Sequence, residues 1–228
     1  MSKSTVCVVG KDKRLEYLAS YLQEHGIKVH RQEEFDSTKL CDSDYLVGPV
    51  NFYPDGKISA EIAESLSETE ISIINYMACE DFLLKNAELT AEGLLAIIIK
   101  NTSFVLAEAR ILILGNGRCG RAIFEMLNLF PCQLDIYDTV PVSPFETPYN
   151  IVINTIPAPV LTKELLTQFE PDCTFFEIAS PPGGFDKAAI EELNLNLIGC
   201  PGIPGKYSPR SAGEAIGRMV MNSFSHDT

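Results

Sequence analysis

A glycine-rich loop follows the apolar run ILIL and contains Gly115, Gly117 and Gly120, with Arg118 and Cys119 between the last two glycines. In a G-x-G-x-x-G loop, the first glycine permits a tight turn, the second lets a diphosphate approach the backbone, and the third lets helix and strand pack closely. The N–H groups at the start of the following helix point at the phosphates. The spacing therefore predicts a dinucleotide site, and the alternative is a strand-to-helix turn without a ligand.

A carboxylate follows at the distance that such a loop requires. Asp138 ends the segment LDIYD, 18 residues beyond Gly120, and about 20 residues separate the glycines from the acid that binds a ribose 2′-hydroxyl. No Arg or Lys directly follows Asp138, whereas the 2′-phosphate of NADP requires a cation. The sequence therefore favours NAD over NADP.

The segment after Asp138 is unusually short for a dinucleotide-binding domain. It reads TVPVSPFETPY, residues 139–149, and has three prolines among its eleven residues. A complete mononucleotide-binding half would place a helix, a strand and another helix here, and prolines at this density oppose regular structure. We therefore expect a trimmed domain without the usual wall beside the adenine, so that the dinucleotide binds weakly or leaves its adenine exposed.

Two further loops follow predicted strands, at 150–154 and 174–178. Loops at the carboxyl ends of parallel strands meet the ligand in this class of fold, and their prolines and glycines hold the backbone rigid. The alternative is that both are ordinary turns, with Thr155 capping a helix. The residues that we expect to line the ribose and nicotinamide are Asn154, Thr155, Ile156, Pro157, Ala179 and Ser180.

The elements that must position these loops alternate between strands and helices, which predicts an α/β fold with two parallel sheets. The first lobe, residues 1–88 with 209–228, is expected to be a small flavodoxin-like domain. The second, residues 89–208, is expected to be a trimmed Rossmann domain. The predicted strands are 5–10, 27–31, 44–50, 71–77, 111–114, 134–137, 150–154, 174–178 and 196–199. The predicted helices are 14–26, 58–68, 90–106 with Thr90 as its cap, 118–129, 162–168, 186–193 and 211–224.

Composition excludes several classes of protein. The 228 residues are 46% hydrophobic and 21% charged, with a formal net charge of −13, which opposes binding to nucleic acid or to an anionic membrane surface. No apolar run reaches the roughly 18 residues of a membrane-spanning helix, and the amino terminus resembles a strand more than a signal peptide. Seven scattered cysteines without a C-x-x-C pair favour reduced thiols over disulfides or a metal site. A cytoplasmic protein is expected.

Several stretches of the chain, taken in order, resemble the dehydrogenase-like A subunits of dipicolinate synthase. The glycine loop alone is common to many dehydrogenases, but the combination of N-T-I-P, A-S-x-P-G-G and P-G-I-P-G-x-x-x-P-R-S-A-G is much more specific. The stretches are VVGKDKR (8–14), EDFLLKNAELTAEG (80–93), ILILGNGRCGRAI (111–123), INTIPAPVL (153–161), EIASPPGGFD (177–186) and CPGIPGKYSPRSAG (200–213).

The resemblance implies an oxidoreductase subunit that uses NAD or NADP to oxidise a dihydrodipicolinate-type ring to dipicolinate, an activity of spore formers. It also implies a separate flavoprotein-like B subunit. The chain looks like a shortened member, because the family has a longer segment after the second strand of the nucleotide-binding lobe. That segment starts with an Arg and a Ser suited to NADP, where this chain has Asp138 and a proline-rich stretch.

A small cyclic dicarboxylate needs cations and backbone donors in its site, since a buried unpaired carboxylate is costly. Asp12 and Arg14 follow the first strand, at the ligand-facing end of a parallel sheet, and match the family's pattern. Arg210 precedes the last helix and is the best candidate cation for the substrate carboxylate, because its guanidinium can bind it in bidentate fashion. Pro204 and Ser211 flank it as further substrate candidates. The alternative for the first loop is a solvated mixture of charges.

The segment NAELTAEG supplies a possible proton-transfer group. Glu92 could act as a general base or bind the ring, with Asn86 and Thr90 as companions. Its alternative role is electrostatic, because an acid in the first turn of a helix favours the helix dipole. None of the three His residues falls in these motifs, so a His-assisted hydride transfer is not supported.

Two other functions stay open. The same fold, trimmed at the adenine wall, could serve as a binding or scaffold protein with little cofactor affinity. It could also be a dehydrogenase of another small carboxylate. A homo-oligomer is expected in each case, without nucleic acid or a membrane as partner.

Overall fold

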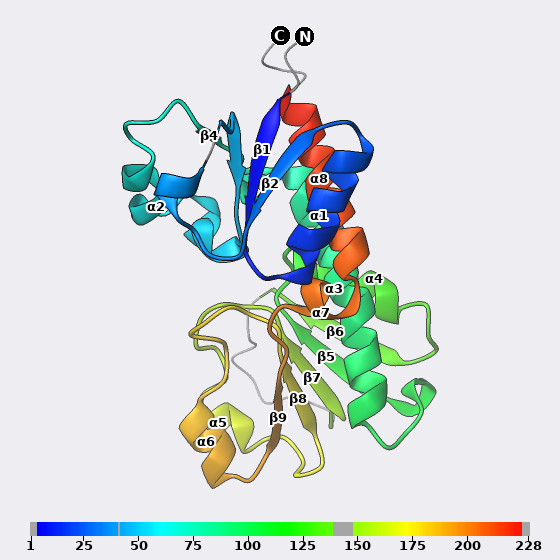
Figure 1. Ribbon diagram of the computed structural model, residues 1–228. Helices are drawn as coiled ribbons and strands as arrows, with labels where there is room; N and C mark the ends of the chain where they lie inside the picture. The colour runs from blue at the N-terminus through cyan, green and yellow to red at the C-terminus, as the bar shows by residue number, and fades with distance from the viewer. Residues whose placement is uncertain (1–3, 41, 139–147, 225–228) are drawn as a thin grey trace. The chain divides into compact units, whose positions relative to one another are not determined.

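The computed structural model describes residues 4–40, 42–138 and 148–224, and the chain divides into two compact units. Unit 1 comprises the chain up to Asn86 together with the chain from Pro204 onward, and unit 2 runs from Ala87 to Ile203. Each unit is built on its own parallel sheet with helices (Figure 1). The predicted α/β class with two parallel sheets is confirmed.

Unit 1 contains a four-stranded sheet in the order β2-β1-β3-β4, all parallel. This is the strand order of a flavodoxin-like sheet, in which the chain leaves the central strand β1 first to one side and then to the other. Its elements are β1 (Thr5–Val9), α1 (Lys13–Glu24), β2 (Lys28–Gln32), β3 (Tyr45–Val47), α2 (Ala60–Ser65), β4 (Ser72–Ile73) and α8 (Pro209–Phe224).

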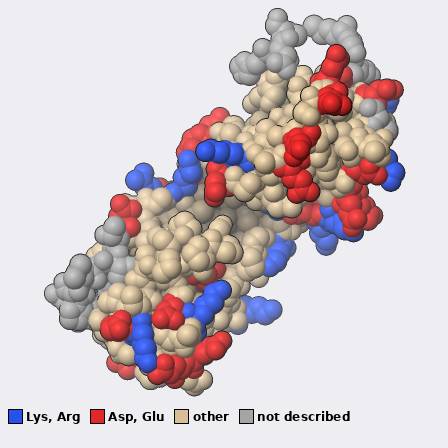
Figure 2. Space-filling view, turned by 90° about the vertical axis from the view of Figure 1, so that its left-hand side faces the viewer, with Lys and Arg blue, Asp and Glu red and all other residues tan. Residues whose placement is uncertain are grey.

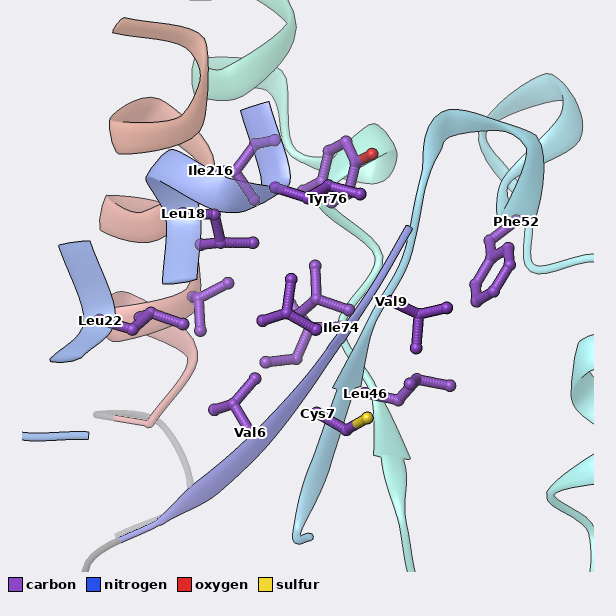
Figure 3. Close-up of a cluster of buried hydrophobic side chains, with 14 of the residues drawn as sticks. Val6, Cys7, Val9, Leu18, Leu22, Leu46, Phe52, Ile74, Tyr76 and Ile216 are labelled. Carbon is purple, nitrogen blue, oxygen red and sulfur yellow. The ribbon is translucent and has the colours of Figure 1, made fainter. Parts of the chain in front are cut away.

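Apolar side chains from both faces of this sheet form the core of unit 1 (Figure 3). Leu18 of α1 and Ile216 of α8 are completely buried against it. The two helices approach closely because α8 carries glycines on the side that meets α1. A Cβ atom at Gly213 would lie 2.4 Å from the carbonyl oxygen of Arg14, and one at Gly217 would lie 2.3 Å from the Tyr21 ring.

Unit 2 contains a five-stranded parallel sheet in the order β6-β5-β7-β8-β9. A complete doubly wound sheet has one more strand on the β6 side, and within the described residues β6 is the edge of the sheet. Residues 139–147, most of the proline-rich segment, lie outside the described residues. The elements are β5 (Arg110–Leu114), α4 (Arg118–Leu127), β6 (Gln133–Tyr137), β7 (Ile151–Asn154), α5 (Lys163–Leu166), β8 (Thr174–Glu177), α6 (Lys187–Glu192) and β9 (Asn196–Gly199).

Two helices run across the boundaries of the units in sequence, α3 (Glu80–Asn101) and α7 (Ile203–Tyr207). The prediction that the long helix begins at Thr90 was wrong. Residues 80–89 contain neither Pro nor Gly, so the helix begins ten residues earlier, and Thr90 is buried in its interior with 5% of its surface exposed. The acids of the first turn are Glu80 and Asp81.

The fourth strand of unit 1 is shorter than predicted. Residues 71–77 were expected to be extended, but β4 spans two residues. Asn75 ends the extended stretch, because its side chain accepts a hydrogen bond from the N–H of Met77 at 3.1 Å and starts a 3-10 turn over Tyr76–Ala78.

The charged surface agrees with the acidic composition. Figure 2 shows Asp and Glu side chains spread over the visible face, with Lys and Arg interspersed among them. The described part of that face carries no continuous basic surface of the kind that nucleic acid requires. No helix among the described residues is long and apolar enough to cross a membrane.

Candidate functional site: the glycine turn of unit 2 and the charged turn of unit 1

The central strand of unit 2, β5, pairs with β6 on one side and with β7 on the other. The chain therefore changes direction around β5, and the loops at the carboxyl ends of β5 and β7 follow this switch point, where open α/β sheets bind their ligands. Gly115 directly follows β5 and has a φ of +99°, which an L side chain rarely adopts. Its N–H donates to the carbonyl oxygen of Tyr137 at 2.7 Å, which ties the turn to the end of β6.

The three glycines differ in how much space surrounds them. A Cβ atom at Gly120 would lie 1.8 Å from the carbonyl oxygen of Gly115, and one at Gly115 would lie 2.2 Å from the hydroxyl oxygen of Thr155. A Cβ atom at Gly117 would meet nothing within 4 Å. The outer glycines are thus needed for packing within the protein. The middle glycine leaves open space above the backbone, as a diphosphate in contact with the main chain requires.

Helix α4 begins at Arg118 without a side-chain cap. Its N-cap residue is Gly117, whose conformation is extended and which offers no side-chain oxygen to the first N–H groups. Those donors can therefore serve an anion. Cys119 lies in the first turn, and burial raises the pKa of its thiol although the charge of Arg118 opposes the shift. Cys119 is thus held as a neutral thiol at pH 7.

Asp138 directly follows β6 and is exposed. The hydrogen bond from Gly115 to Tyr137 brings the end of β6 beside the glycine turn. This is the place at which an acid binds the ribose of a dinucleotide. The predicted pair of glycine turn and carboxylate is therefore brought together by the fold.

The loop after β7 supports the glycine turn from within the protein. The Thr155 hydroxyl donates to the carbonyl oxygen of Leu114 at 2.8 Å, so it braces the end of β5 and does not cap a helix. Asn154 is completely buried. The accessible residues of this loop include Ile156, which is half-buried, and Pro157, which is exposed.

Glu177, at the end of β8, was not singled out from the sequence. Its carboxylate accepts hydrogen bonds from the Asn154 amide at 2.8 Å, the Ala179 N–H at 3.1 Å and the Gly184 N–H at 2.7 Å. Ser180 lies exposed in the same loop. An acid at the end of a buried strand, followed by two glycines, was the available signal, and only the fold shows which donors surround it.

In unit 1 the corresponding turn after β1 holds an ion pair. Arg14 donates to Asp12 through Nε at 2.9 Å and also through Nη2, and the side chains are 13% and 29% exposed. Burial alone would raise the pKa of Asp12, but the hydrogen bonds and charge of Arg14 outweigh it, so the pKa is lowered. The segment after Pro204 lies against this pair, because a Cβ atom at Gly205 would be 3.0 Å from Arg14 Nε.

Two buried tyrosines lie near this turn in unit 1. Tyr76 donates to the carbonyl oxygen of Gly48 at 3.1 Å, and the hydroxyl of Tyr53 donates to the carbonyl oxygen of Ile74 at 2.9 Å. Burial raises the pKa of Tyr53 to about 12, and burial also raises the pKa of Tyr76. Both side chains therefore remain neutral at pH 7 and act as fixed hydrogen-bond donors.

Arg210 lies in the first turn of α8, at the start of the last helix. Its Nε donates to Glu214 at 2.8 Å, one turn along α8, and its side chain is 77% exposed. It lines a shallow hollow with Tyr17 and Glu24, so the described structure does not bring it to Asp12 and Arg14. Ser211, beside it, is exposed as well.

The candidates on α3 are separated by their burial. Asn86 is half-buried, Thr90 is buried, and Glu92 is exposed in the middle of the helix. Glu92 is therefore not a first-turn acid, and the helix-dipole explanation of its presence no longer applies. Among the described residues, no group of three or more His, Cys, Asp or Glu side chains is arranged to hold a metal ion.

No model of a known protein family matches the chain. Over 183 residues the chain is 22% identical to the A subunit of dipicolinate synthase from Bacillus subtilis strain 168, a match that spans 72% of this chain and 62% of that protein. The resemblance to dipicolinate synthase A subunits is confirmed. The matched part is thus less than two thirds of the length of this relative.

Solved structures of dipicolinate synthase A subunits share the whole fold. The one from Bacillus halodurans has a TM-score of 0.82 at 18% identity, over 96% of this chain and 97% of that chain. The one from Bacillus subtilis also has a TM-score of 0.82, at 17% identity, over 99% and 97%. D-lactate dehydrogenase from Escherichia coli has the same general fold, with a TM-score of 0.66 at 11% identity over 98% and 96%. The chain therefore has a dehydrogenase-like fold.

Proposed function

We propose that this chain is the dinucleotide-dependent subunit of an oxidoreductase that converts a dihydrodipicolinate-like cyclic dicarboxylate to dipicolinate. The observation that carries the proposal is the glycine turn, in which the outer glycines are packed tightly and Gly117 is open beside an uncapped helix. The similarity to the dipicolinate synthase of Bacillus subtilis supports the choice of substrate.

The residues of unit 2 fit a dinucleotide. Gly117 and the first N–H groups of α4 would hold the diphosphate, and Asp138 would accept hydrogen bonds from the adenosine ribose. We assign NAD and not NADP as the preferred cofactor, because a carboxylate at Asp138 repels a 2′-phosphate. Ile156, Pro157 and the Ala179–Ser180 loop would face the nicotinamide. A bound dinucleotide supplies the hydride acceptor.

The substrate requires a cation, and Arg14 is the best candidate. Asp12 engages its Nε and Nη2, which fixes the plane of the guanidinium without neutralising the far nitrogen by direct contact. A largely buried Arg held in one orientation presents the remaining nitrogen, Nη1, for a hydrogen bond to a carboxylate. Arg210, bonded to Glu214 in solvent, is the weaker candidate.

The reaction balances without a protein nucleophile. Aromatisation of the ring removes one hydride and one proton, which together carry away two electrons, and a bound dinucleotide would accept the hydride. Glu92, exposed on α3, is the carboxylate that we propose as acceptor of this proton, with Asn86 and Thr90 on the same helix. The other requirement is to hold the donor carbon against the nicotinamide.

We further propose that the chain acts with a B subunit, since the relative from Bacillus subtilis is the A component of a synthase with more than one kind of chain, and that it forms a homo-oligomer. Co-expression with a candidate flavoprotein-like B subunit tests the first expectation. Light scattering of the purified chain tests the second.

Titration of the purified chain with NAD and with NADP by calorimetry tests the proposed function. We expect saturable binding of NAD and weaker binding of NADP. Absence of binding by either dinucleotide at millimolar concentration would overturn the proposal. Formation of dipicolinate from freshly generated dihydrodipicolinate, followed by its ultraviolet absorbance, then tests the substrate.

A second candidate is a binding or scaffold protein with little cofactor affinity. Within the described residues β6 is the edge strand of unit 2, which favours a reduced adenine side. The same titration separates the two functions. A dehydrogenase of another small carboxylate is the third candidate, favoured by the shared fold with D-lactate dehydrogenases, and it would bind NAD but leave dihydrodipicolinate unchanged.

A further inference from the structure

A buried polar link joins two loops at the carboxyl edge of the unit 2 sheet. β7 and β8 are neighbouring parallel strands, and their last residues, Asn154 and Glu177, are paired in register. Their side chains meet through the hydrogen bond from Asn154 Nδ2 to Glu177 Oε1 at 2.8 Å. Each side chain also binds the backbone of the loop that follows its own strand.

Asn154 organises the first loop. Its Oδ1 accepts from the N–H of Ile156 at 3.1 Å, and its Nδ2 donates to the carbonyl oxygen of the same residue at 2.9 Å. Both polar groups of Ile156 are therefore held by one completely buried amide. This arrangement leaves little freedom in the backbone that leads to Pro157.

Glu177 organises the second loop in the same way. Its Oε1 accepts from the N–H of Ala179 at 3.1 Å and its Oε2 accepts from the N–H of Gly184 at 2.7 Å. One carboxylate thus closes the loop at both ends. Two glycines allow this approach, because a Cβ atom at Gly184 would lie 2.3 Å from Asn154 Nδ2, and one at Gly183 would lie 2.7 Å from Glu177 Oε2.

The backbone continues the connection between the loops. The carbonyl oxygen of Gly184 accepts from the N–H groups of Val160 and Leu161, each at 2.9 Å, and Leu161 forms a parallel bridge with Phe185. The loops after β7 and β8 therefore form one hydrogen-bonded layer. Glu177 therefore reaches the first loop through Asn154 and binds the second loop directly.

We infer that Glu177 is a positioning residue, which acts through Asn154 and the Ala179–Gly184 loop to hold the surface that receives the nicotinamide. This inference rests on the proposed function. Glu177 accepts from three N–H groups, of which two belong to the backbone of the Ala179–Gly184 loop. Accessible residues of the two loops include Ile156 and Ser180. Its effect should be confined to the nicotinamide half of the dinucleotide, since the glycine turn is braced separately by Thr155.

Glu177→Gln is the decisive variant, because it keeps the size of the side chain and replaces one acceptor oxygen by a donor. The matched control is Glu192→Gln, which removes a carboxylate from the surface of the same unit, where Glu192 pairs with Lys163. The probes are NAD and ADP-ribose, which shares the diphosphate and adenosine of NAD but lacks nicotinamide. Calorimetry measures both affinities, and circular dichroism verifies the fold.

We expect Glu177→Gln to weaken NAD binding by about tenfold, while ADP-ribose binds within about twofold of the wild type and Glu192→Gln changes neither affinity. Equal losses for both probes would show a merely structural role, and unchanged NAD affinity would also overturn the inference. If Glu177→Gln fails to fold, Glu177→Asp replaces it, because this variant keeps the charge but has a shorter side chain. The test is again whether NAD affinity falls more than ADP-ribose affinity. A wild type that binds neither probe overturns the proposed function, and this inference with it.

Discussion

The two units use the same strand order around their first strand but fill the turn after it with different chemistry. In each, a glycine with positive φ ends the first strand, Gly10 in unit 1 and Gly115 in unit 2. In unit 1 the following helix is capped by Asp12, whose carboxylate accepts from the N–H of Arg14 at 2.9 Å. In unit 2 the helix begins at Gly117 without a side-chain cap.

The difference shows how one topology can present either side chains or bare backbone to a ligand. Asp12 occupies the amino terminus of α1, so the group left to meet an anion in unit 1 is the guanidinium of Arg14. In unit 2 the corresponding N-cap residue is Gly117, which has no side chain, so the backbone N–H groups themselves can contact a phosphate. The unit 1 turn therefore suits a carboxylate and the unit 2 turn suits a dinucleotide.

The largest effect is expected from closing the glycine turn. Gly120→Ala should destabilise unit 2 by about 3 kcal/mol and remove NAD binding, because the added Cβ atom would lie 1.8 Å from a backbone oxygen. Hydrogen exchange followed by mass spectrometry measures the stability of the two units separately. Gly117→Ala is the matched control, which should keep full stability and lose only NAD affinity. Equal stability of both variants would contradict the packing role of Gly120.

The second-largest effect is expected from removing Asp138, the carboxylate beside the glycine turn. Asp138→Ala is expected to reduce NAD affinity by about 2 kcal/mol, the range for hydrogen bonds to a charged group, with little change in stability because Asp138 is exposed. NADP affinity should fall less or rise, since a repelling charge is removed. Calorimetric titration with both dinucleotides measures the ratio of NAD affinity to NADP affinity. If the variant has the same ratio as the wild type, Asp138 does not contact the ribose.

The ion pair of unit 1 gives a prediction that depends on pH. Asp12→Asn keeps a cap for α1 but removes the charge, and it should cost about 1 kcal/mol of stability at pH 7. The pKa of Asp12 is lowered in the folded chain from a usual value of 3.8, so the wild type's advantage exists above that pH and disappears as the pH falls below it. Urea unfolding at pH 7 and near pH 3 checks this, and a constant difference would refute it.

The smallest effect is expected for Arg210→Ala. The Arg210–Glu214 pair lies in solvent, where such pairs contribute about 0.5 kcal/mol or less. Dipicolinate formation should therefore be nearly unchanged, whereas Arg14→Ala should abolish it while NAD still binds. Steady-state rates at saturating NAD compare the two variants. A large loss of dipicolinate formation in Arg210→Ala would indicate that the substrate carboxylate binds Arg210, the cation favoured from the sequence.

Local patterns explain which parts of the fold were predictable. The strand before Gly115 and the acid at Asp138 were recognisable because a parallel sheet needs an apolar run before each loop and a fixed spacing between them. The start of α3 was missed because Thr90 resembles a cap, although it is an interior residue of a longer helix. For Arg210 the sequence shows the cation, but only the fold shows the Glu214 carboxylate that binds it.

The sequence by itself determined the α/β class, the glycine turn and the carboxylate that follows it, since these depend on order and spacing along the chain. Only the tertiary structure decided that Thr155 braces the turn from within, that Arg14 is held by Asp12, and that Glu177 joins two loops. The physical reason is that a hydrogen bond depends on the distance between two atoms in space. Residues 23 or 41 positions apart in sequence, such as Asn154 with Glu177 or Leu114 with Thr155, meet only once the strands have paired.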